Sequence, residues 1–465
     1  MKMIIEPEIF KAICMAEKSS GYKCFVVGGY IRNHLLGLKS DDIDFVIEGD
    51  SLLFAEKVAE ILGRRKVIKF PRFKTAKVVY KKKSIEFVSA RSEKYEPDSR
   101  KPAVENSTLF NDLSRRDFTI NALAAEITEF GVGEIIDHFG GMNDLQKRIL
   151  RTPLSPVETY SEDPLRMLRC IRFASTLNFN IERKSFEAIT SNVERLDIVS
   201  VERISDEFFK ILSSINPVKG ILLLYRTNLI KKLFPEIADL TGMDDRGGIR
   251  HKDVFVHTLK VLYNISKTTD KLELRLAALM HDIGKPKTKY FKNEQGWTFH
   301  GHDEKGAELF NEIAKKFKWS NGISDYVSKI IRLHHRPISL TKEEVTDSGV
   351  RRLLYEGGES VDDLMLLCRA DITTANKNKL KKYLENFDKL SNKILEVEEK
   401  DKLRNFKPPI NGVDIMTAFN EKEGPTIGRI KKIIVDAILS GEIGNNRESA
   451  IGLLNKLIIE EKAMK

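Results

Sequence analysis

The hydrophobic pattern changes near residue 157, and this change limits the fold of the 465-residue chain more than any other feature. Before it, short apolar runs and one helical pattern over residues 51–63 predict a small sheet with a covering helix. The strand-like runs are "CFVVGG", "IDFVIEG", "KTAKVVY" and "SIEFVSA". After it, apolar residues recur at three- and four-residue spacing, which predicts helices. We therefore expect an α+β protein with a small mixed sheet in an N-terminal head, followed by an all-α body.

Composition excludes several classes of protein. The hydrophobic content of 41% and charged content of 31% are typical of a globular chain. Uncharged apolar runs are too short to cross a bilayer, and acidic residues break up the N-terminal apolar runs, so we expect neither a membrane partner nor a signal peptide. The four cysteines form no CxxC pair, which favours reduced thiols and a cytoplasmic protein. The net charge of +10 is weak evidence for a polyanionic partner.

The run "DIDFVI" sets Asp42 and Asp44 two residues apart in a predicted strand, so that both carboxylates project from one face. Two like charges this close are unfavourable unless a cation lies between them, and hard divalent cations prefer oxygen ligands. Glu86 in "SIEFV" is the best-placed third carboxylate, although a surface glutamate would fit the pattern nearly as well. The predicted catalytic residues are therefore Asp42, Asp44 and Glu86. A pair of magnesium ions at such residues activates a hydroxyl for attack on a nucleoside triphosphate.

Residues near these carboxylates suit a bound nucleotide. The glycines at 28 and 29 follow a predicted strand, where bare backbone can approach a ligand closely, and Arg32 comes soon after. In "LSRRDFTINALA", Arg115 and Arg116 offer planar forks for phosphate, and Asp117 can accept from a ribose hydroxyl. By itself, such a turn is more often a helix N-terminus with surface charge.

The segment "EDPLRMLRCIR" carries a pattern that suits base selection. Asp163 and Arg166 are three apart on a predicted helix, and Arg169 continues the line. Cytosine and adenine both present an amino donor beside a ring-nitrogen acceptor, whereas guanine and uracil present a carbonyl beside a ring N–H. A carboxylate next to a guanidinium complements the first pair of bases and mismatches the second. The alternative is a surface ion pair of ~0.3–0.5 kcal/mol.

Five segments, in their order along the chain, resemble the motif blocks of class II tRNA nucleotidyltransferases, the bacterial and eukaryotic CCA-adding enzymes, and of bacterial poly(A) polymerases. They are "VVGGYIRNHLLG...DDIDF", "DLSRRDFTINALA", "IIDHFGGMNDLQKRILR", "EDPLRMLRCIRFA" and "VERISDEFFKIL". The resemblance covers roughly residues 20–215 and implies a polymerase-β-like nucleotidyltransferase head that uses two Mg²⁺ ions. The chain departs from the family at Asn33, where an aspartate is usual.

The resemblance also implies roles for individual residues. Asp42 and Asp44 would be metal ligands, Arg115 and Asp117 would contact the nucleotide, and residues 162–166 would belong to a base-selecting helix. The complete predicted nucleotide-binding set is Gly28, Gly29, Arg32, Arg115, Arg116, Asp117, Asn121, Glu162, Asp163, Arg166 and Arg169.

Histidines are concentrated in a second region, with seven of the nine between residues 251 and 335. An amphipathic helix that ends just before Gly284 would place His281 and Asp282 at its C-terminal end. A lone histidine is usually a packed or capping residue. Histidine, His-Asp and aspartate elements on successive helices instead suit a divalent site with mixed nitrogen and oxygen ligands.

These elements resemble the HD superfamily of metal-dependent phosphohydrolases over about residues 251–375. The resemblance implies a divalent transition metal or Mg²⁺, and hydrolysis of a phosphate ester is left open against a helical domain that only holds RNA. The implied metal ligands are His257, His281, Asp282 and Asp371. The residues implied nearby, for a second metal or for phosphate, are Lys285, His302 and His334.

Taken together, the motifs predict a template-independent enzyme that adds CCA to tRNA 3′ ends from CTP and ATP and releases pyrophosphate. CC-adding, A-adding and poly(A)-adding members share these motifs, and a phosphohydrolase with a nucleotide-binding head is the alternative from another class. The expected domains are a catalytic head (1–155), a helical neck that selects nucleotides and binds RNA (156–245), an HD domain (246–400) and a helical tail in contact with tRNA (401–465).

Overall fold

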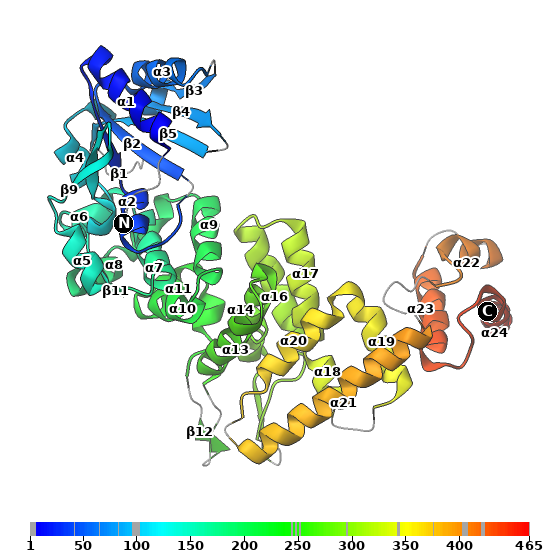
Figure 1. Cartoon of the computed structure of the whole chain (residues 1–465). Helices are drawn as coiled ribbons and strands as arrows, with labels where there is room; N and C mark the ends of the chain where they lie inside the picture. Colours follow the sequence, from blue (N-terminus) through cyan, green and yellow to red (C-terminus); the bar gives the residue numbers. More distant parts are fainter. Residues whose placement is uncertain are drawn as a thin grey trace. The chain divides into compact units, whose positions relative to one another are not determined.

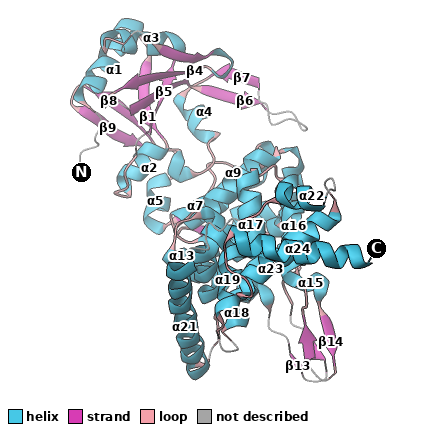
Figure 2. Cartoon of the chain, turned by 90° about the vertical axis from the view of Figure 1, so that its right-hand side faces the viewer, coloured by secondary structure: helices cyan, strands magenta, loops and turns pink. Residues whose placement is uncertain are grey.

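The chain forms two compact units, residues 1–235 and 236–465, and each is described here by itself (Figure 1). The computed structural model describes residues 6–40, 42–64, 66–81, 83–94, 103–242, 245–246, 249–250, 253–293, 296–341, 345–374, 376–401, 408–419 and 424–464. Strands are concentrated in the head of the first unit, and helices dominate the rest, which confirms the expected α+β architecture (Figure 2). The finer division into four domains stays a prediction.

The head contains a seven-stranded mixed sheet with the order β3-β4-β5-β2-β1-β8-β9. Its strands are β1 (Lys23–Val27), β2 (Asp42–Glu48), β3 (Val67–Phe70), β4 (Thr75–Tyr80), β5 (Lys83–Ser89), β8 (Ala124–Thr128) and β9 (Gly131–Ile136). Strands β2 and β5 are parallel, whereas the other neighbouring pairs that the structure describes are antiparallel. The parallel register sets Asp44 directly opposite Glu86.

Two helices, α1 (Pro7–Ser20) and α3 (Ser51–Ile61), pack side by side on one face of this sheet (Figure 1). Helix α3 begins at Ser51 because the Asp50 carboxylate accepts hydrogen bonds from the amides of Leu52 and Leu53. Under it, Phe87 stacks on Phe45 with ring centroids 5.4 Å apart. Side chains alternate along a strand, so this apolar packing leaves the carboxylates of β2 and β5 on the opposite face.

Short elements connect and follow the strands of the head. They are α2 (Gly29–Leu35), the 3₁₀ turn η1 (Pro71–Phe73), the hairpin of β6 (Arg91–Lys94) and β7 (Ala103–Asn106), α4 (Leu109–Ser114), η2 (Thr119–Asn121) and α5 (Gly141–Lys147). The helices that follow in the first unit are α6 (Pro156–Glu162), α7 (Leu165–Thr176), α8 (Arg183–Ser191), α9 (Val201–Leu212), α10 (Pro217–Arg226) and α11 (Leu229–Leu233).

The start of α7 differs from the sequence-based expectation. Helix α6 ends at Glu162, Asp163 is extended with φ −131°, and α7 begins at Leu165. Pro164 explains the break, because a proline disfavours helical conformation in the residue before it and suits the start of a helix. The Asp163 carboxylate accepts a hydrogen bond from the Leu165 amide at 3.2 Å, so Asp163 precedes the helix that carries Arg166. Placing both on one continuous helix was wrong.

The second unit is built from helices, with two short hairpins (Figure 2). Its helices are α13 (Val254–Thr268), α14 (Leu272–Met280), α15 (Lys285–Thr288), α16 (His302–Lys316), α17 (Asn321–Leu333), α18 (His335–Leu340), α19 (Asp347–Gly357), α20 (Val361–Asp371), α21 (Lys377–Asp401), α22 (Gly412–Phe419), α23 (Pro425–Ser440) and α24 (Arg447–Met464). Helix α14 packs against α13, α17 and α20, and it ends directly before His281 as predicted. Among the described residues, no helix is both long and apolar enough to cross a membrane.

Candidate active site and candidate metal centre

Three carboxylates gather on the open face of the head sheet. Asp44 and Glu86 are paired residues of β2 and β5, and Asp42 lies two positions before Asp44 on the same face. Burial raises the pKa of Asp44, and the charge of Asp42 raises it further, against the opposing effect of Arg116. Burial and the charge of Asp44 likewise raise the pKa of Glu86. This crowded negative charge and its oxygen atoms fit a hard divalent cation.

A cavity of about 1130 Å³ covers this face of the sheet within the first unit. Its lining contains more arginines than carboxylates. This balance suits an anionic ligand that binds together with metal cations. The predicted residues that line it are Gly29, Arg32, Asp44, Glu86, Arg115, Arg116, Asp117, Asn121, Asp163, Arg166 and Arg169. Three described residues of the predicted sets, Gly28, Asp42 and Glu162, are outside this lining.

The glycine turn after β1 requires its glycine at position 28. Gly28 has a φ of 68°, which residues with a side chain rarely adopt. A Cβ at this position would also lie 2.7 Å from Nη1 of Arg116. The turn therefore lets an arginine approach the backbone at the start of α2.

Arg32, on the first turns of α2, is held by two amide side chains. It donates to Oδ1 of Asn121 at 2.6 Å, and to Oδ1 of Asn33 from Nε at 3.0 Å and from Nη2 at 2.7 Å. Burial lowers the pKa of Arg32 to about 10, so it stays charged at neutral pH. Asn33, the departure from the family pattern, thus fixes the direction of this guanidinium.

Arg115 and Arg116 share a buried partner, Asp112, which sequence reasoning missed. The Asp112 carboxylate accepts from Nη2 of Arg115 at 2.5 Å and from Nη2 of Arg116 at 3.0 Å. Burial alone would raise the pKa of Asp112, but the two guanidinium groups hold it below its usual value. The spacing of three and four residues in "DLSRR" was the available signal, because such residues are neighbours on a helix.

Asp117 is occupied by protein donors in this arrangement. Its Oδ2 accepts from Nε and Nη2 of Arg169 at 2.9 and 2.6 Å, and its Oδ1 accepts from Nδ2 of Asn121 and the Phe118 amide, both at 2.9 Å. A carboxylate has about four acceptor sites, and these bonds use them. A ribose hydroxyl would therefore have to share an oxygen that already accepts two donors. The predicted ribose contact stays a prediction.

Arg166 is buried and faces the backbone. Its guanidinium donates to the carbonyls of Thr159 at 3.3 Å and Arg115 at 2.8 Å, and its Nη1 lies 3.6 Å from the Glu162 carboxylate. The charge of Asp163 contributes, after that of Asp117, to the raised pKa of Arg169. Arg166, the arginine of the predicted selector pair, and Arg169 both line the cavity, and the charge of Asp163 acts on Arg169.

In the second unit, the four predicted metal ligands come together from three places in the helical fold. They are His257 on α13, His281 and Asp282 after α14, and Asp371 at the end of α20. Nε2 of His257 lies 2.8 Å from Oδ1 of Asp371, and Nε2 of His281 lies 3.6 Å from the same oxygen. The ligand atoms of His257, His281 and Asp371 are all within 4.8 Å of one another.

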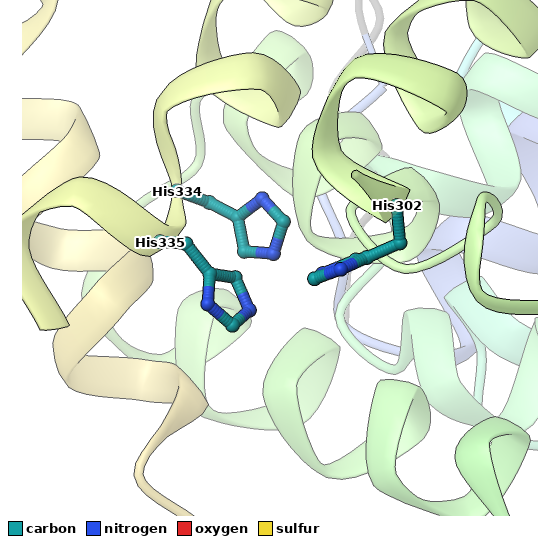
Figure 3. Close-up of side chains that lie close together, drawn as sticks. All are labelled: His302, His334 and His335. Atoms are coloured by element: carbon teal, nitrogen blue, oxygen red, sulfur yellow. The ribbon is translucent and has the colours of Figure 1, made fainter. Parts of the chain in front are cut away.

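A second histidine group lies beside the first. The rings of His302, His334 and His335 turn toward one another, with ligand nitrogens within 4.8 Å (Figure 3). Nε2 of His302 and Nε2 of His334 lie 3.7 and 3.8 Å from Oδ1 of Asp282. The other oxygen of Asp282, Oδ2, lies 3.3 Å from Nε2 of His281. Asp282 therefore stands between the two groups, and His335, although adjacent to His334, was absent from the predicted set.

The hydrogen bonds of these histidines fit metal ligation. Nδ1 donates to a backbone carbonyl in His281 (Ala278, 2.9 Å), His302 (Phe299, 2.8 Å) and His334 (Ile331, 2.5 Å). In His302 and His334 this leaves Nε2 as the free lone pair of the ring, buried and without a hydrogen-bond partner among the described residues. Oδ1 of Asp282 is likewise buried and has no hydrogen-bond partner among the described residues. Imidazole nitrogens with carboxylate oxygens form the mixed ligand set of divalent transition metals.

The protonation of the histidines in the second unit also fits metal ligation. Burial lowers the pKa of His302, His334 and His335, the last to about 4, so these rings are neutral at pH 7 and available as ligands. Burial also opposes protonation of His281, but the charges of Asp282 and Asp371 raise its pKa to about 10. The carboxylates of Asp282 and Asp371 therefore favour a positive charge beside them, and a bound metal cation would supply it.

The fold and the two candidate sites define a class of protein in which a nucleotidyltransferase head is followed by a helical region and an HD domain. A family model for the poly(A) polymerase head domain matches residues 24–151. Models for the "probable RNA and SrmB- binding site of polymerase A" and for the HD domain match residues 178–241 and 254–376.

Comparisons with individual proteins narrow this class. The chain is 33% identical to a multifunctional CCA protein of Methylococcus capsulatus over 75% of the chain and 81% of that protein. It is 28% identical to an A-adding tRNA nucleotidyltransferase of Deinococcus radiodurans over 91% and 93%. The CCA-adding enzyme of Bacillus stearothermophilus, solved with CTP, shares the fold at a TM-score of 0.65 and 24% identity over 99% of this chain and 100% of that one. The chain therefore belongs to the tRNA nucleotidyltransferase family and is an enzyme.

Proposed function

We propose that this enzyme completes the CCA end of tRNA from CTP and ATP without a nucleic-acid template. The observation that carries the proposal is a single cavity with facing carboxylates, Asp44 and Glu86, on its floor and an arginine-rich wall around them. The multifunctional CCA relative supports this product. The A-adding relative keeps addition of A alone open as an alternative, along with CC and poly(A) addition.

The arginines would bind and orient the triphosphate. Arg32, Arg115 and Arg116 line the cavity, and each is fixed by side-chain partners rather than left to rotate. The glycine turn at 28–29 adds backbone that a phosphate can approach. Preorganised cations of this kind stabilise the negative charge that develops on the leaving pyrophosphate.

The bond change follows from these positions. Magnesium ions held by Asp42, Asp44 and Glu86 would lower the pKa of the attacking hydroxyl and stabilise the leaving group. The tRNA 3′ oxygen forms a bond to the α-phosphorus, the bond from that phosphorus to the bridging oxygen of pyrophosphate breaks, and the hydroxyl proton leaves beside the aspartates. We propose that attack takes place beside these carboxylates, two of which, Asp44 and Glu86, line the cavity.

Base selection would fall to residues around the start of α7. A carboxylate at Asp163 accepts from the amino group shared by cytosine and adenine, and a guanidinium of Arg166 or Arg169 donates to the ring nitrogen beside it. The same pair offers mismatched partners to guanine and uracil. Because Asp163 interacts with Arg169, we propose that both arginines take part.

The test is nucleotide incorporation into a tRNA transcript that lacks CCA, with CTP and ATP and Mg²⁺. Asp44→Asn keeps the shape of the side chain but removes its charge, and we expect incorporation to fall at least about 1000-fold, as for loss of a main electrostatic group. Asp206→Asn is the matched control, because Asp206 is exposed and pairs only with Lys210 on α9 among the described residues. Equal activity of Asp44→Asn and Asp206→Asn would contradict the proposal.

A second activity is favoured by the histidine groups of the second unit. We propose that this unit would hold two divalent cations, one at His257, His281 and Asp371 and the other at histidines 302, 334 and 335, with Asp282 available to both. Such a pair activates water for hydrolysis of phosphate esters. Lys285, 2.6 Å from Asp282, would place a positive charge beside the site.

Metal analysis tests this second proposal. After dialysis against Mn²⁺, Ni²⁺, Co²⁺ or Mg²⁺, we expect close to two bound ions per chain for the metal that fits, and hydrolysis of bis(p-nitrophenyl) phosphate that depends on it. His302→Ala should lower the bound metal to about one. Retention of no metal would contradict the proposal.

The remaining assignments are proposals about partners and place. We propose that the helices after residue 401 contact the tRNA. We also propose a cytoplasmic location, supported by four cysteines that are all buried and free of disulfides.

A further inference from the structure

The loop between β3 and β4 contributes residues to the active-site cavity that the nucleotide does not account for. Arg72, Phe73 and Lys74 line the same cavity as Asp44 and Glu86. The Phe73 side chain is 57% exposed, although it sits in a cavity lined mainly by charged groups. An exposed aromatic ring between two cations is a typical contact for single-stranded nucleic acid.

The backbone under Phe73 is fixed at several points. The Phe73 carbonyl accepts from Nη1 of Arg91 at 2.9 Å. The next residue, Lys74, has a φ of 47°, and its carbonyl accepts from the Ser89 amide at 3.0 Å and from Oγ of Ser51 at 2.7 Å. The loop therefore presents the exposed ring from a rigid base, which limits the entropy lost when a ligand stacks on it.

The sheet order places this loop opposite the glycine turn. The order β4-β5-β2-β1 puts the carboxylates of β5 and β2 in the middle. The glycine turn follows β1 on one side of them, and the loop precedes β4 on the other. If the triphosphate lies by the glycine turn and Arg32, the second reactant must approach from the side of β4.

A run of hydrogen bonds connects the loop to the base-selecting region. Arg166 donates to the Arg115 carbonyl at 2.8 Å, Arg115 donates to the Arg91 carbonyl at 3.1 Å, and Arg91 donates to the Phe73 carbonyl at 2.9 Å. The backbone that carries the ring is thus fixed relative to the residues proposed to hold the incoming nucleotide. Two reactants bound at the two ends of this run would meet over the carboxylates.

We propose that Phe73 stacks on the terminal base of the RNA primer and that Arg72 and Lys74 bind its phosphates. The inference rests on the proposed nucleotidyl transfer, for which it names the primer subsite. Stacking suits this primer, because its last base changes after every addition and every base offers the same aromatic face. A hydrogen-bonding pocket would instead favour one of the successive ends.

Kinetics of Phe73→Ala test the proposal. We expect the KM for tRNA primer to rise about 5- to 100-fold, the range for loss of one base–aromatic stack, while the KM for CTP and ATP changes less than about twofold. Phe73→Trp should keep the primer KM of the unmodified enzyme. Phe70→Ala is the matched control, since Phe70 is 45% exposed at the end of β3 but lies outside the cavity lining.

A binding measurement separates failure of this inference from failure of the proposed function. A tRNA primer with 2-aminopurine as its last base, mixed with enzyme without nucleotide, should lose fluorescence on stacking, and Phe73→Ala should prevent this loss. Arg72→Ala should lower the salt dependence of binding by about one counterion. An enzyme without incorporation would refute the proposed function, yet this fluorescence would still test the subsite. Equal behaviour of Phe73→Ala and Phe70→Ala, or a change in nucleotide KM alone, would overturn the inference.

Discussion

At the scale of single residues, buried carboxylates hold the arginines that line the candidate active-site cavity. Asp112 holds Arg115 and Arg116, and Asp117 holds Arg169. Each pair keeps a guanidinium in one direction, so that it costs little further entropy to bind a phosphate or a base. The positive wall of the cavity therefore depends on acidic residues that need not touch the substrate.

Replacing Asp112 by Asn tests this dependence. We expect a loss of about 2–3 kcal/mol of stability at pH 7, typical of hydrogen bonds to charged groups, and a KM for nucleotide raised about tenfold. Because the pKa of Asp112 is lowered in the folded state, its contribution is complete above pH ~4 and is lost as the pH falls through the lowered value. Thermal unfolding from pH 7 to pH 3 should therefore show a smaller loss in the variant than in the unmodified protein. Identical pH profiles would refute this role.

At the scale of helices and strands, the sequence predicts those features that depend on local pattern. The alternation in "DIDFVI" predicted a strand with Asp42 and Asp44 on one face, which β2 confirms, and the amphipathic pattern before Gly284 placed His281 and Asp282 correctly at the end of α14. The register that pairs Asp44 with Glu86 is set by a parallel crossover, which local pattern does not encode.

Other features could not be predicted because they depend on tertiary packing. Phe73 directly precedes the strand-like run "KTAKVVY", and only the tertiary fold brings its loop to the cavity. His335 belongs to the second histidine group because the fold brings α16, α17 and α18 together, which the sequence pattern does not show. The helix break before Leu165, in contrast, could have been predicted from Pro164.

A close helix contact brings Asp282 and His302 together, and Gly284 makes it possible. A Cβ at Gly284 would lie 2.1 Å from the His302 carbonyl oxygen and 2.6 Å from the Gly306 amide nitrogen. Gly284→Ala should therefore destabilise the protein by about 2–3 kcal/mol and weaken metal binding. Gly322→Ala is the control, because nothing lies within 4 Å of a Cβ there and alanine favours the helix. Equal melting temperatures of the two variants would contradict this explanation.

At the scale of the whole molecule, the two candidate sites lie in different compact units. The carboxylates and arginines of the nucleotide cavity belong to residues 1–235, and both histidine groups belong to residues 236–465. Each described site is complete within its own unit.

Separate sites should fail separately. We expect Asp282→Asn to lose bound metal and ester hydrolysis while it incorporates nucleotides at the unmodified rate, and Asp44→Asn to do the reverse. Metal content and incorporation, measured on the same preparations, check both halves of this expectation. A variant that lost both activities while remaining folded, as judged by thermal unfolding, would show that the two sites depend on each other.

The central claim is the product of the reaction, and sequencing of RNA 3′ ends tests it most directly. Three tRNA transcripts, ending at the base before CCA, after the first C and after CC, would each be incubated with Mg²⁺, CTP and ATP. We expect all three transcripts to converge on a single CCA end and extension then to stop, with no use of GTP or UTP. Addition of C alone, of A only to the transcript ending in CC, or of an open-ended A tail would contradict it.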